Sequence, residues 1–478
     1  MPETKTEFIG RLGELKKSLG VRLDILDSIH LFKTRQTIAN LMLFLSSCGV
    51  KFLNIGSIFA RLNGRQISSF AVDENILTAA LFGENFPQED AINFTVSFFN
   101  GHNTQASRVE FSKFCDKHDH WIDSYSMYRA LVEQIGANDF SKWPEILRVC
   151  IRRNADVIKR QLSREILRHK ILQFFARKQL ALIKKLANDA GIFLCCDCDV
   201  LCDVLSADVW STQKSFFVNS ISQATVFTGF PPSDVCHGGI KTTKVPYRIG
   251  YLKNSNYELF GHMFSNLQSM ADAIFLVNGH SIFQYWEIAC TENNPKYGRW
   301  VNMPTDVFFK YLDHHFNNFP YLFDFNEPLL PSNEVISKRH GILQMVISGE
   351  PTAHSCDVYN LSRKLFAIAS PMCNRKVPHA NGSSAEVKTC LDNFRGGEYV
   401  LCVLHFMEIC GIAKCTEEAA ISNPTLHGRS VGSFACVERP KAEEARRVDV
   451  THAVARPNGA DGKPAWRRIV NAFRNIFR

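Results

Sequence analysis

The sequence predicts an α/β protein with one large core, and two observations support this prediction. First, helix-type and strand-type apolar segments alternate: a helix-type segment at 31–49 precedes a strand-type segment at 50–56, and a helix-type segment at 172–192 leads into another strand. Such alternation is typical of β/α folds. Second, 45% of the 478 residues are apolar and 37 are Phe, which is enough to fill a substantial core.

Residues 1–40 are expected to form an amphipathic helical segment, because charged and apolar residues alternate through it. The segment has no apolar h-region of the kind a secretory signal carries. No run of about 18 uncharged apolar residues occurs, so a transmembrane span is not expected. The sequence therefore favours a cytoplasmic protein, whose 16 cysteines would be mostly buried, reduced thiols.

The densest cysteine cluster is Cys195, Cys196, Cys198 and Cys202. It lacks the paired Cys-x-x-Cys motifs of a structural zinc site, and on a strand Cys195 points away from Cys196 and Cys198. Buried filling of a strand is therefore the favoured interpretation. Two other groups are interpreted in the same way: Cys115 with His118 and His120, and His314 with His315. We expect neither a metal nor an organic cofactor.

Several ordered motifs resemble those of one enzyme family. They are HWIDSY at 120–125, WPE at 143–145, SADVW at 206–210, GFPP at 229–232 and GRWV at 298–301. In this order they resemble the amylomaltases, the 4-alpha-glucanotransferases of bacteria and plants, over roughly residues 118–350. The resemblance implies a (β/α)8 TIM barrel at 41–436, with a helical insertion at about 80–170.

The segment at 271–288 resembles the family's nucleophile strand, which reads approximately RIDH and closes on YWEIP. Laid without a gap on Asp272 and on YWEI at 285–288, the chain has Phe275 at the arginine and Val277 at the aspartate. A valine has no lone pair with which to attack an anomeric carbon, so the covalent route of a retaining transferase is closed there. Asp272 cannot substitute, because it lies five positions before Val277. An odd offset on a strand places it on the opposite face, near the other end of the strand.

The other catalytic positions of the resemblance are also altered. Asp324 falls at the family's acid/base glutamate and is one methylene shorter. The third carboxylate, in a THDN segment of the family, is replaced by Ser370, Pro371 or Met372 under any one-residue shift. Residues that could still belong to a glucan site are Asp197, Asp208, Trp210 and Trp286.

The tail has a pattern of its own. Residues 437–463 are rich in Arg, Glu, Ala, Pro and Gly, as in a linker. Residues 464–478 predict a basic amphipathic helix, whose apolar face is formed by Trp466, Ile469, Val470, Phe473, Ile476 and Phe477. Such a helix could dock on the barrel, lie on a membrane surface, or be read as a signal by a partner or an export machine.

Two functional hypotheses remain open. In the first, the chain is a degenerate amylomaltase-like protein, catalytically inactive and retained for binding or interaction. In the second, it is an active 4-alpha-glucanotransferase that uses Asp324 as acid/base and transfers α-1,4-glucan segments between maltooligosaccharides. The partner in either case would be an α-1,4-glucan or maltooligosaccharide, if any sugar binding remains, with a protein or a membrane as a further partner of residues 464–478. Nucleic acid is not expected, because the net charge of +8 is modest and no aromatic-basic motif accompanies it.

Overall fold

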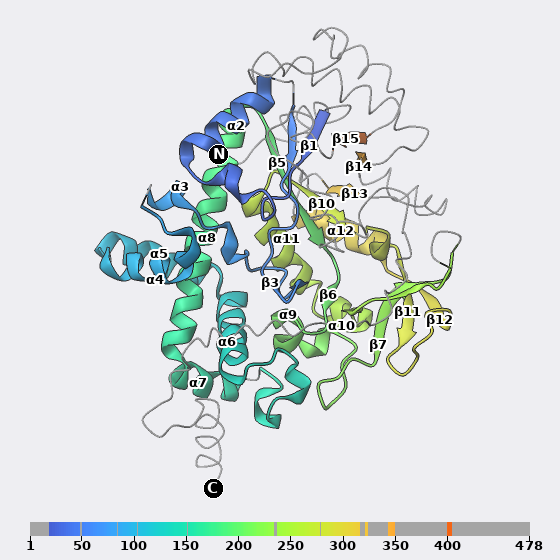
Figure 1. The fold of residues 1–478 in the computed structure, drawn as a ribbon. Helices are drawn as coiled ribbons and strands as arrows, with labels where there is room; N and C mark the ends of the chain where they lie inside the picture. The colour runs from blue at the N-terminus through green and yellow to red at the C-terminus, as the bar shows by residue number, and fades with distance from the viewer. Residues whose placement is uncertain are drawn as a thin grey trace, which may run out of the picture.

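The computed structural model describes residues 19–47, 50–83, 85–102, 104–150, 152–233, 237–277, 279–315, 321–323, 343–348 and 399–403. Figure 1 shows a group of roughly parallel strands next to long helices, with a smaller sheet set to one side. The linker at 437–463, the helix expected at 464–478, and the candidate residues Asp324, Ser370, Pro371 and Met372 lie outside the described residues.

Seven described strands pair in parallel and form the centre of the fold. They are β1 (Leu19–Arg22), β2 (Phe52–Asn54), β5 (Phe193–Asp199), β10 (Ala273–Val277), β13 (Tyr321–Phe323), β14 (Leu343–Ser348) and β15 (Tyr399–Val403). Their order is β1-β15-β14-β13-β10-β5-β2, and β2 pairs with β1 to close the ring. The predicted α/β class with a parallel sheet is confirmed, whereas the eight-stranded form stays a prediction.

The ring begins earlier in the chain than expected. Within the segment 1–40, interpreted from its charge pattern as helical, residues Leu19–Arg22 form strand β1. This part of the prediction is wrong, because the segment finds strand partners on both sides, β15 and β2, which are far away in sequence. Val21 is fully buried between them. Long-range pairing of this kind overrides local helical periodicity.

Long helices cover the outside of the ring. They are α2 (Arg35–Ser47), α8 (Ser163–Asp189), α11 (Glu258–Met270) and α12 (Thr305–His315). Helix α8 is 27 residues long and contacts α2, α11 and β5, so it ties the helical layer to the sheet. In Figure 1 it runs down the side of the molecule on which the shorter helices gather.

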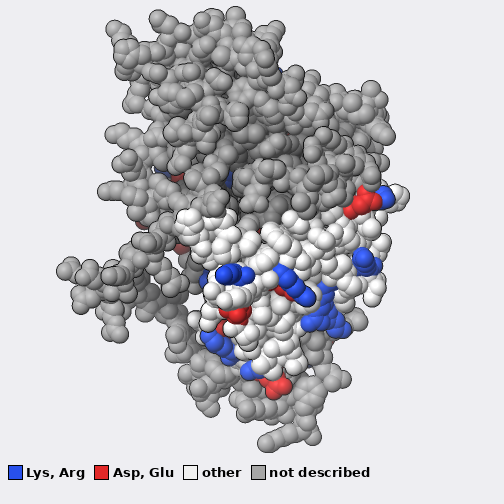
Figure 2. Space-filling model, turned by 90° about the vertical axis from the view of Figure 1, so that its right-hand side faces the viewer, with Lys and Arg blue, Asp and Glu red and all other residues white. Residues whose placement is uncertain are grey.

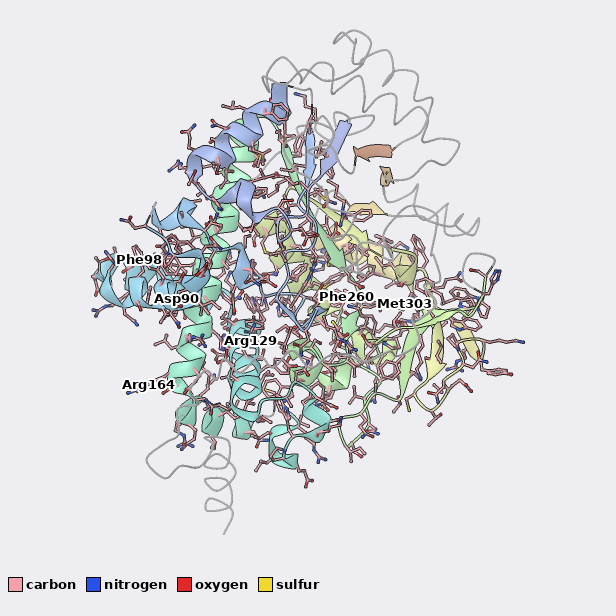
Figure 3. The ribbon with its side chains drawn as sticks, viewed as in Figure 1. Asp90, Phe98, Arg129, Arg164, Phe260 and Met303 are labelled. Atoms are coloured by element: carbon pink, nitrogen blue, oxygen red, sulfur yellow. The ribbon has the colours of Figure 1, made fainter. Side chains whose placement is uncertain are left out.

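The region at about 80–170, where a helical insertion was expected, consists of short and medium helices. They are α3 (Ala79–Phe82), α4 (Ala91–Gly101), α5 (Gln105–Lys117), α6 (Asp119–Ile135) and α7 (Arg152–Gln161). Phenylalanines hold α3 and α4 to α8: Phe82 lies 5.1 Å from both Phe98 and Phe175, measured between ring centroids. Phe98 is labelled at the outer edge of this group in Figure 3. Aromatic packing therefore anchors the insertion.

A separate antiparallel sheet has the order β12-β11-β7-β8. Its strands are β7 (Val226–Phe230), β8 (Ile240–Lys241), β11 (Gln284–Ala289) and β12 (Gly298–Asn302). Smaller elements are β3 (Arg61–Leu62), β4 (Arg65–Gln66), β6 (Cys202–Asp203), β9 (Lys244–Val245), α9 (Ala207–Ser211) and α10 (Ile249–Asn254). The short 3-10 helices are η1 (Ile29–Phe32), η2 (Glu74–Ile76), η3 (Gln88–Asp90), η4 (Phe140–Lys142), η5 (Glu145–Leu147), η6 (Gln213–Ser215) and η7 (Gly279–Ile282).

The clustered cysteines are core residues. Cys195, Cys196, Cys198 and Cys202 are buried, and burial raises the pKa of the Cys196 thiol to about 12. Among the described residues, no group of three or more His, Cys, Asp or Glu side chains is arranged to hold a metal ion. None of the described helices combines the length and apolar character needed to cross a membrane.

One buried charge network joins η2, α6 and α8. The Glu74 carboxylate lies 3.5 Å from the guanidinium of Arg129, which is labelled in Figure 3, and 3.6 Å from Nδ1 of His169. The other ring nitrogen of His169 lies 3.2 Å from Glu133. Burial alone would raise the pKa of Glu74, but Arg129 and His169 outweigh it and lower the pKa to about 2.

Replacing Arg129 should therefore destabilise the fold in a pH-dependent way. We expect Arg129→Met to lower the free energy of unfolding by about 3 kcal/mol at pH 7, because a buried carboxylate loses its cation. The folded-state pKa of Glu74, about 2, lies below its ordinary 4.5, so the stabilisation is complete above pH 4.5 and lost as the pH falls toward 2. Urea unfolding at pH 7 and pH 3 should show the difference from wild type narrowing in acid.

The matched control is Lys142→Met, because Lys142 pairs with Asp139 while its side chain is 80% exposed. Its effect should stay below about 1 kcal/mol at both pH values. Equal losses in the two variants would contradict a stabilising role for the buried network.

Candidate functional site

The candidate site lies on the inner face of the strand ring, where the strands end. Val21, Leu53 and Cys196 belong to the hydrophobic core shared with the surrounding helices. Side chains alternate between the two faces of a strand, so Arg22 and Asp197 point to the opposite, inner face. Arg22 is the last residue of β1, and Asp197 lies two residues before the end of β5.

A buried, two-point ion pair crosses this inner face. Arg22 donates from Nη1 to Oδ1 of Asp197 at 3.0 Å and from Nη2 to Oδ2 at 2.6 Å. Asn54, at the end of β2 between them, donates from Nδ2 to the same Oδ1 at 3.0 Å, and its own Oδ1 accepts from the Gly56 amide at 2.7 Å. Asp197 is 1% exposed. Both of its carboxylate oxygens are therefore held by the protein, in the geometry that Arg favours for carboxylates.

The strand pairing puts Val277, at the position where the resemblance expects a nucleophile, on the same inner face. In the pairing of β10 with β5, Phe275 lies beside Asp197 and Val277 beside Asp199. Phe275 is 3% exposed, and Val277 is partly exposed as the last residue of β10. On its other side β10 pairs with β13, where Leu276 lies beside Phe323. Asp324 follows β13 directly in the sequence.

Asp199 lies at the mouth of the ring, the end where β5 and β10 finish. It is not among the candidate residues that the sequence predicts. Its Oδ2 lies 3.3 Å from Nζ of Lys244, and its Oδ1 accepts from the Leu201 amide at 2.9 Å. Burial lowers the pKa of Lys244, but Asp199 and Asp203 outweigh it and raise the pKa overall. The signal was present in the sequence, since residues 197 and 199 must share a face if β5 is a strand.

A second overlooked carboxylate, Asp24, follows β1 by two residues. Burial, then Asp27, raises its pKa to about 6. The chain approaches it closely at Gly56, where a Cβ would lie 2.5 Å from Oδ2 of Asp24 and where φ is +71°. Only glycine fits there without strain. Asp24 is therefore a second carboxyl group at this end of the ring, and its burial raises its pKa.

Comparison with known proteins identifies the fold and its family. Residues 88–336, more than half of the chain, match the sequence profile described as 4-alpha-glucanotransferase. The chain belongs to this family. The expected resemblance to amylomaltases is thereby confirmed.

Among its relatives, the 4-alpha-glucanotransferase of Thermus thermophilus is 23% identical over 252 residues, which are 52% of this chain and 50% of that protein. The enzyme of the same name from Aquifex aeolicus is 24% identical over 212 residues, 44% of this chain and 43% of that protein. The chain thus spans about half the length of the curated relatives it matches.

Two solved structures share the fold. An amylomaltase from Streptococcus agalactiae in complex with acarbose superposes with a TM-score of 0.66 at 17% identity, covering 82% of this chain and 90% of that one. The amylomaltase from Corynebacterium glutamicum gives a TM-score of 0.54 at 12% identity, covering 84% and 68%. At these identities the likeness concerns the fold alone.

Two of the possible glucan-site residues of this 4-alpha-glucanotransferase family member are built into its core. Asp208 accepts from the Ser69 amide at 2.6 Å and from Oγ of Ser68 at 3.1 Å, and burial raises its pKa to about 6. Trp210 is fully buried and donates from Nε1 to the Leu147 carbonyl at 2.9 Å. Both side chains have protein partners, which favours a structural role over contact with sugar.

Trp286, the other aromatic candidate, lies in the antiparallel sheet on β11. Its Nε1 donates to the Pro295 carbonyl at 2.8 Å, and its ring contacts Trp300 edge to face at 5.4 Å between centroids. The structure therefore places one of the four glucan-site candidates, Asp197, on the inner face of the ring, and the other three in α9 and β11.

Asp272 has the position expected for it, at the start of β10. Its Oδ2 accepts from the Leu194 amide at 2.9 Å and from Nδ2 of Asn188 at 2.7 Å, and its Oδ1 lies 3.3 Å from Lys184. These partners belong to α8 and to the beginning of β5. Asp272 is thus a structural carboxylate at the end of the strands opposite to Val277.

The inner ion pair should behave as a coupled unit. Because Arg22 and Asp197 are 7% and 1% exposed, Arg22→Met alone or Asp197→Leu alone should cost about 3–5 kcal/mol of unfolding free energy by removing the two-point partner of a buried charge. The double variant should recover most of that loss. Urea unfolding of the four proteins gives the coupling energy.

Lys185→Met is the control, since Lys185 pairs with Asp189 on the surface of α8 with its side chain 62% exposed. It should change stability by less than about 1 kcal/mol. Additive effects of the Arg22 and Asp197 substitutions would show that the two side chains do not depend on each other.

Proposed function

We propose that this chain is an amylomaltase-like protein on a (β/α)8 barrel that no longer transfers glucan and is retained for binding or interaction. The observation that carries the proposal is Val277, a hydrocarbon side chain at the end of β10, on the inner face where the family places its nucleophile. We also propose a cytoplasmic location, in which the described cysteines, most of them buried, stay reduced.

The chemistry of a retaining transferase requires a carboxylate that attacks the anomeric carbon, about 5 Å from a second carboxyl group that protonates the leaving oxygen. Val277 cannot attack. Phe275 replaces a charged guanidinium with an apolar ring. Asp197 lies two residues before Asp199 on β5, farther from the mouth. Both of its carboxylate oxygens are bound by Arg22 and Asn54.

The sequence adds support from positions outside the described residues. Asp324 is the candidate for the acid/base, and Ser370, Pro371 and Met372 cover the position of the third carboxylate without supplying one. An acid without a nucleophile cannot complete the double displacement. We therefore propose that an α-1,4-glucan or maltooligosaccharide, where it is bound at all, is held and not cleaved.

One observation favours the second candidate function, an active 4-alpha-glucanotransferase. Asp199 lies beside Val277 in the register, on a neighbouring strand, so its backbone is about 5 Å away. If the nucleophile had moved to the adjacent strand, Asp199 would supply it. Against this, the Asp199 carboxylate already pairs with Lys244 and accepts from the Leu201 amide.

Disproportionation of maltotriose tests the two functions. We expect the purified wild-type chain to release glucose at least about 10⁴-fold more slowly than the Thermus thermophilus relative under the same conditions, as expected when a nucleophile is lost. Glucose release and product lengths are measured together, so that hydrolysis is separated from transfer. A rate comparable with that of the relative would contradict the proposal.

Three variants assign any activity that is found. Asp199→Asn should abolish it if Asp199 is the nucleophile, whereas Val277→Ala should leave it unchanged. Asp324→Ala should reduce it if Asp324 is the acid/base. Activity that survives Asp199→Asn would exclude Asp199 as the nucleophile.

For residues 464–478 we propose a helix that rests on another surface, either the barrel, a protein partner or an anionic lipid surface. The support is the sequence alone: one apolar face with Trp and Phe, flanked by arginines. Apolar area of this size is rarely left exposed to water.

Deleting residues 464–478 distinguishes the surfaces. A lower melting temperature is expected if the helix docks on the barrel, because apolar contacts are lost. Unchanged melting with lost binding to anionic vesicles, or to a partner, is expected if it docks elsewhere. A truncated protein identical to the full chain in melting, vesicle binding and cellular location would remove this segment from the functional account.

A further inference from the structure

A cleft outside the strand ring has the composition of a binding site. Its volume is about 640 Å³, within the usual range for small-ligand sites. It lies between η6, α10 and the outer strands β11 and β12, and it is lined by Lys214, Phe217, Arg248, Ile249, Gly250, Tyr251, Tyr285, Glu287, Arg299 and Val301. None of these residues belongs to the strands of the ring.

The floor of the cleft carries one polar group that is open to the cavity. Tyr285 is 2% exposed as a whole residue, but its hydroxyl is not one of the fully buried polar atoms that lack a partner, and the residue lines the cleft. Burial, then Glu287, raises the pKa of this hydroxyl, so it stays protonated and can donate. A hydroxyl at the floor of a cleft, carried by a buried ring that fixes its position, is placed to donate to a bound molecule. Tyr285 therefore points to a ligand with a hydrogen-bond acceptor.

The floor also carries a carboxylate whose charge is neutralised. Glu287 is 7% exposed, and Oε1 accepts from Nε of Arg299 at 2.7 Å and from Nη2 at 2.6 Å. Oε1 holds both of these contacts. The other oxygen, Oε2, can accept from a sugar hydroxyl without bringing a net negative charge to the cleft.

The rim is basic and aromatic. Lys214 is exposed and forms no ion pair with any residue in the described part of the chain. Arg248 donates to the Val218 carbonyl at 2.7 Å and lies over the Phe217 ring at 5.8 Å. Among the described residues it forms no ion pair. Tyr251 is 42% exposed at the same rim. Figure 2 looks onto the side of the molecule that carries β11 and β12, where Lys and Arg side chains are spread over the described surface with acidic groups between them.

We propose that this cleft binds an anionic carbohydrate, with a phosphorylated sugar as the simplest form. The flat rings of Phe217 and Tyr251 suit the apolar face of a pyranose. Tyr285 and Glu287 supply a donor and an acceptor for its hydroxyls. Lys214 and Arg248 supply the charge for the anionic group. The inference concerns a second site and holds whether or not the ring mouth is catalytic.

Isothermal titration of the full-length chain with glucose 6-phosphate, glucose and inorganic phosphate tests the proposal. We expect glucose 6-phosphate to bind about tenfold or more tightly than glucose or phosphate alone, and its affinity to fall with added salt. Lys214→Met and Tyr285→Phe should each weaken binding about tenfold, the effect of one lost hydrogen bond to a charged or buried group. Tyr285→Phe removes only an oxygen that has no described protein partner, so the fold is unaffected.

The matched controls are Lys253→Met, on the same helix as Tyr251 but outside the cleft, and Tyr297→Phe, a tyrosine that is 62% exposed. Both should bind as the wild type does, with unchanged melting. The proposal is overturned if glucose 6-phosphate does not bind, if glucose or phosphate alone binds as tightly, or if the cleft variants match their controls.

Discussion

Inside the ring of parallel strands, the pair formed by Arg22 and Asp197 joins β1 to β5 across β2, with Asn54 bonded between them. The two charged residues are 175 positions apart in sequence, so the pair exists only when the ring has formed. Once removed from water, each charge needs the other, because the cost of an unpaired buried charge exceeds the gain from most single contacts. The arrangement of the inner face follows from this requirement. Asp197 lies beside Phe275 in the strand pairing. The next residues on the inner face, Asp199 and Val277, lie beside each other at the mouth.

This arrangement is compatible with our proposal that a chain of the 4-alpha-glucanotransferase family keeps its fold without the family's chemistry. The outer face of the strands, with Leu53, Leu194 and Cys196, supplies the core that holds the helices in place. Apart from the pair of Arg22 and Asp197, the inner face contributes little to that core, so its other residues can change without loss of the sheet. We propose that Phe275 and Val277 are such changes. They keep the strand buried and extended but leave the mouth without a carboxylate on β10.

Much of the fold could be predicted from the sequence, because it depends on local patterns. The strand that became β2, the long helix α8 and the strand after it were all visible as apolar segments. Placing Val277 at the end of a strand required only a gapless motif. What could not be predicted depends on contacts between distant segments. Strand β1 lay in a segment interpreted as helical, and nothing near Arg22 in the sequence indicates that its partner is Asp197. Trp210 was a glucan-site candidate as an aromatic side chain, but its indole is fully buried against the chain itself.

The central claim is that no carboxylate of this mouth can act as a nucleophile, and an activated donor tests it most directly. In maltotriosyl fluoride the leaving group needs no proton, so fluoride release depends on the nucleophile and not on Asp324. Fluoride release and peptide mass mapping after incubation should show the uncatalysed rate and no glycosyl adduct for the wild-type chain. Fluoride release well above that rate, together with a glycosyl adduct on Asp199 or any other carboxylate, would contradict the account.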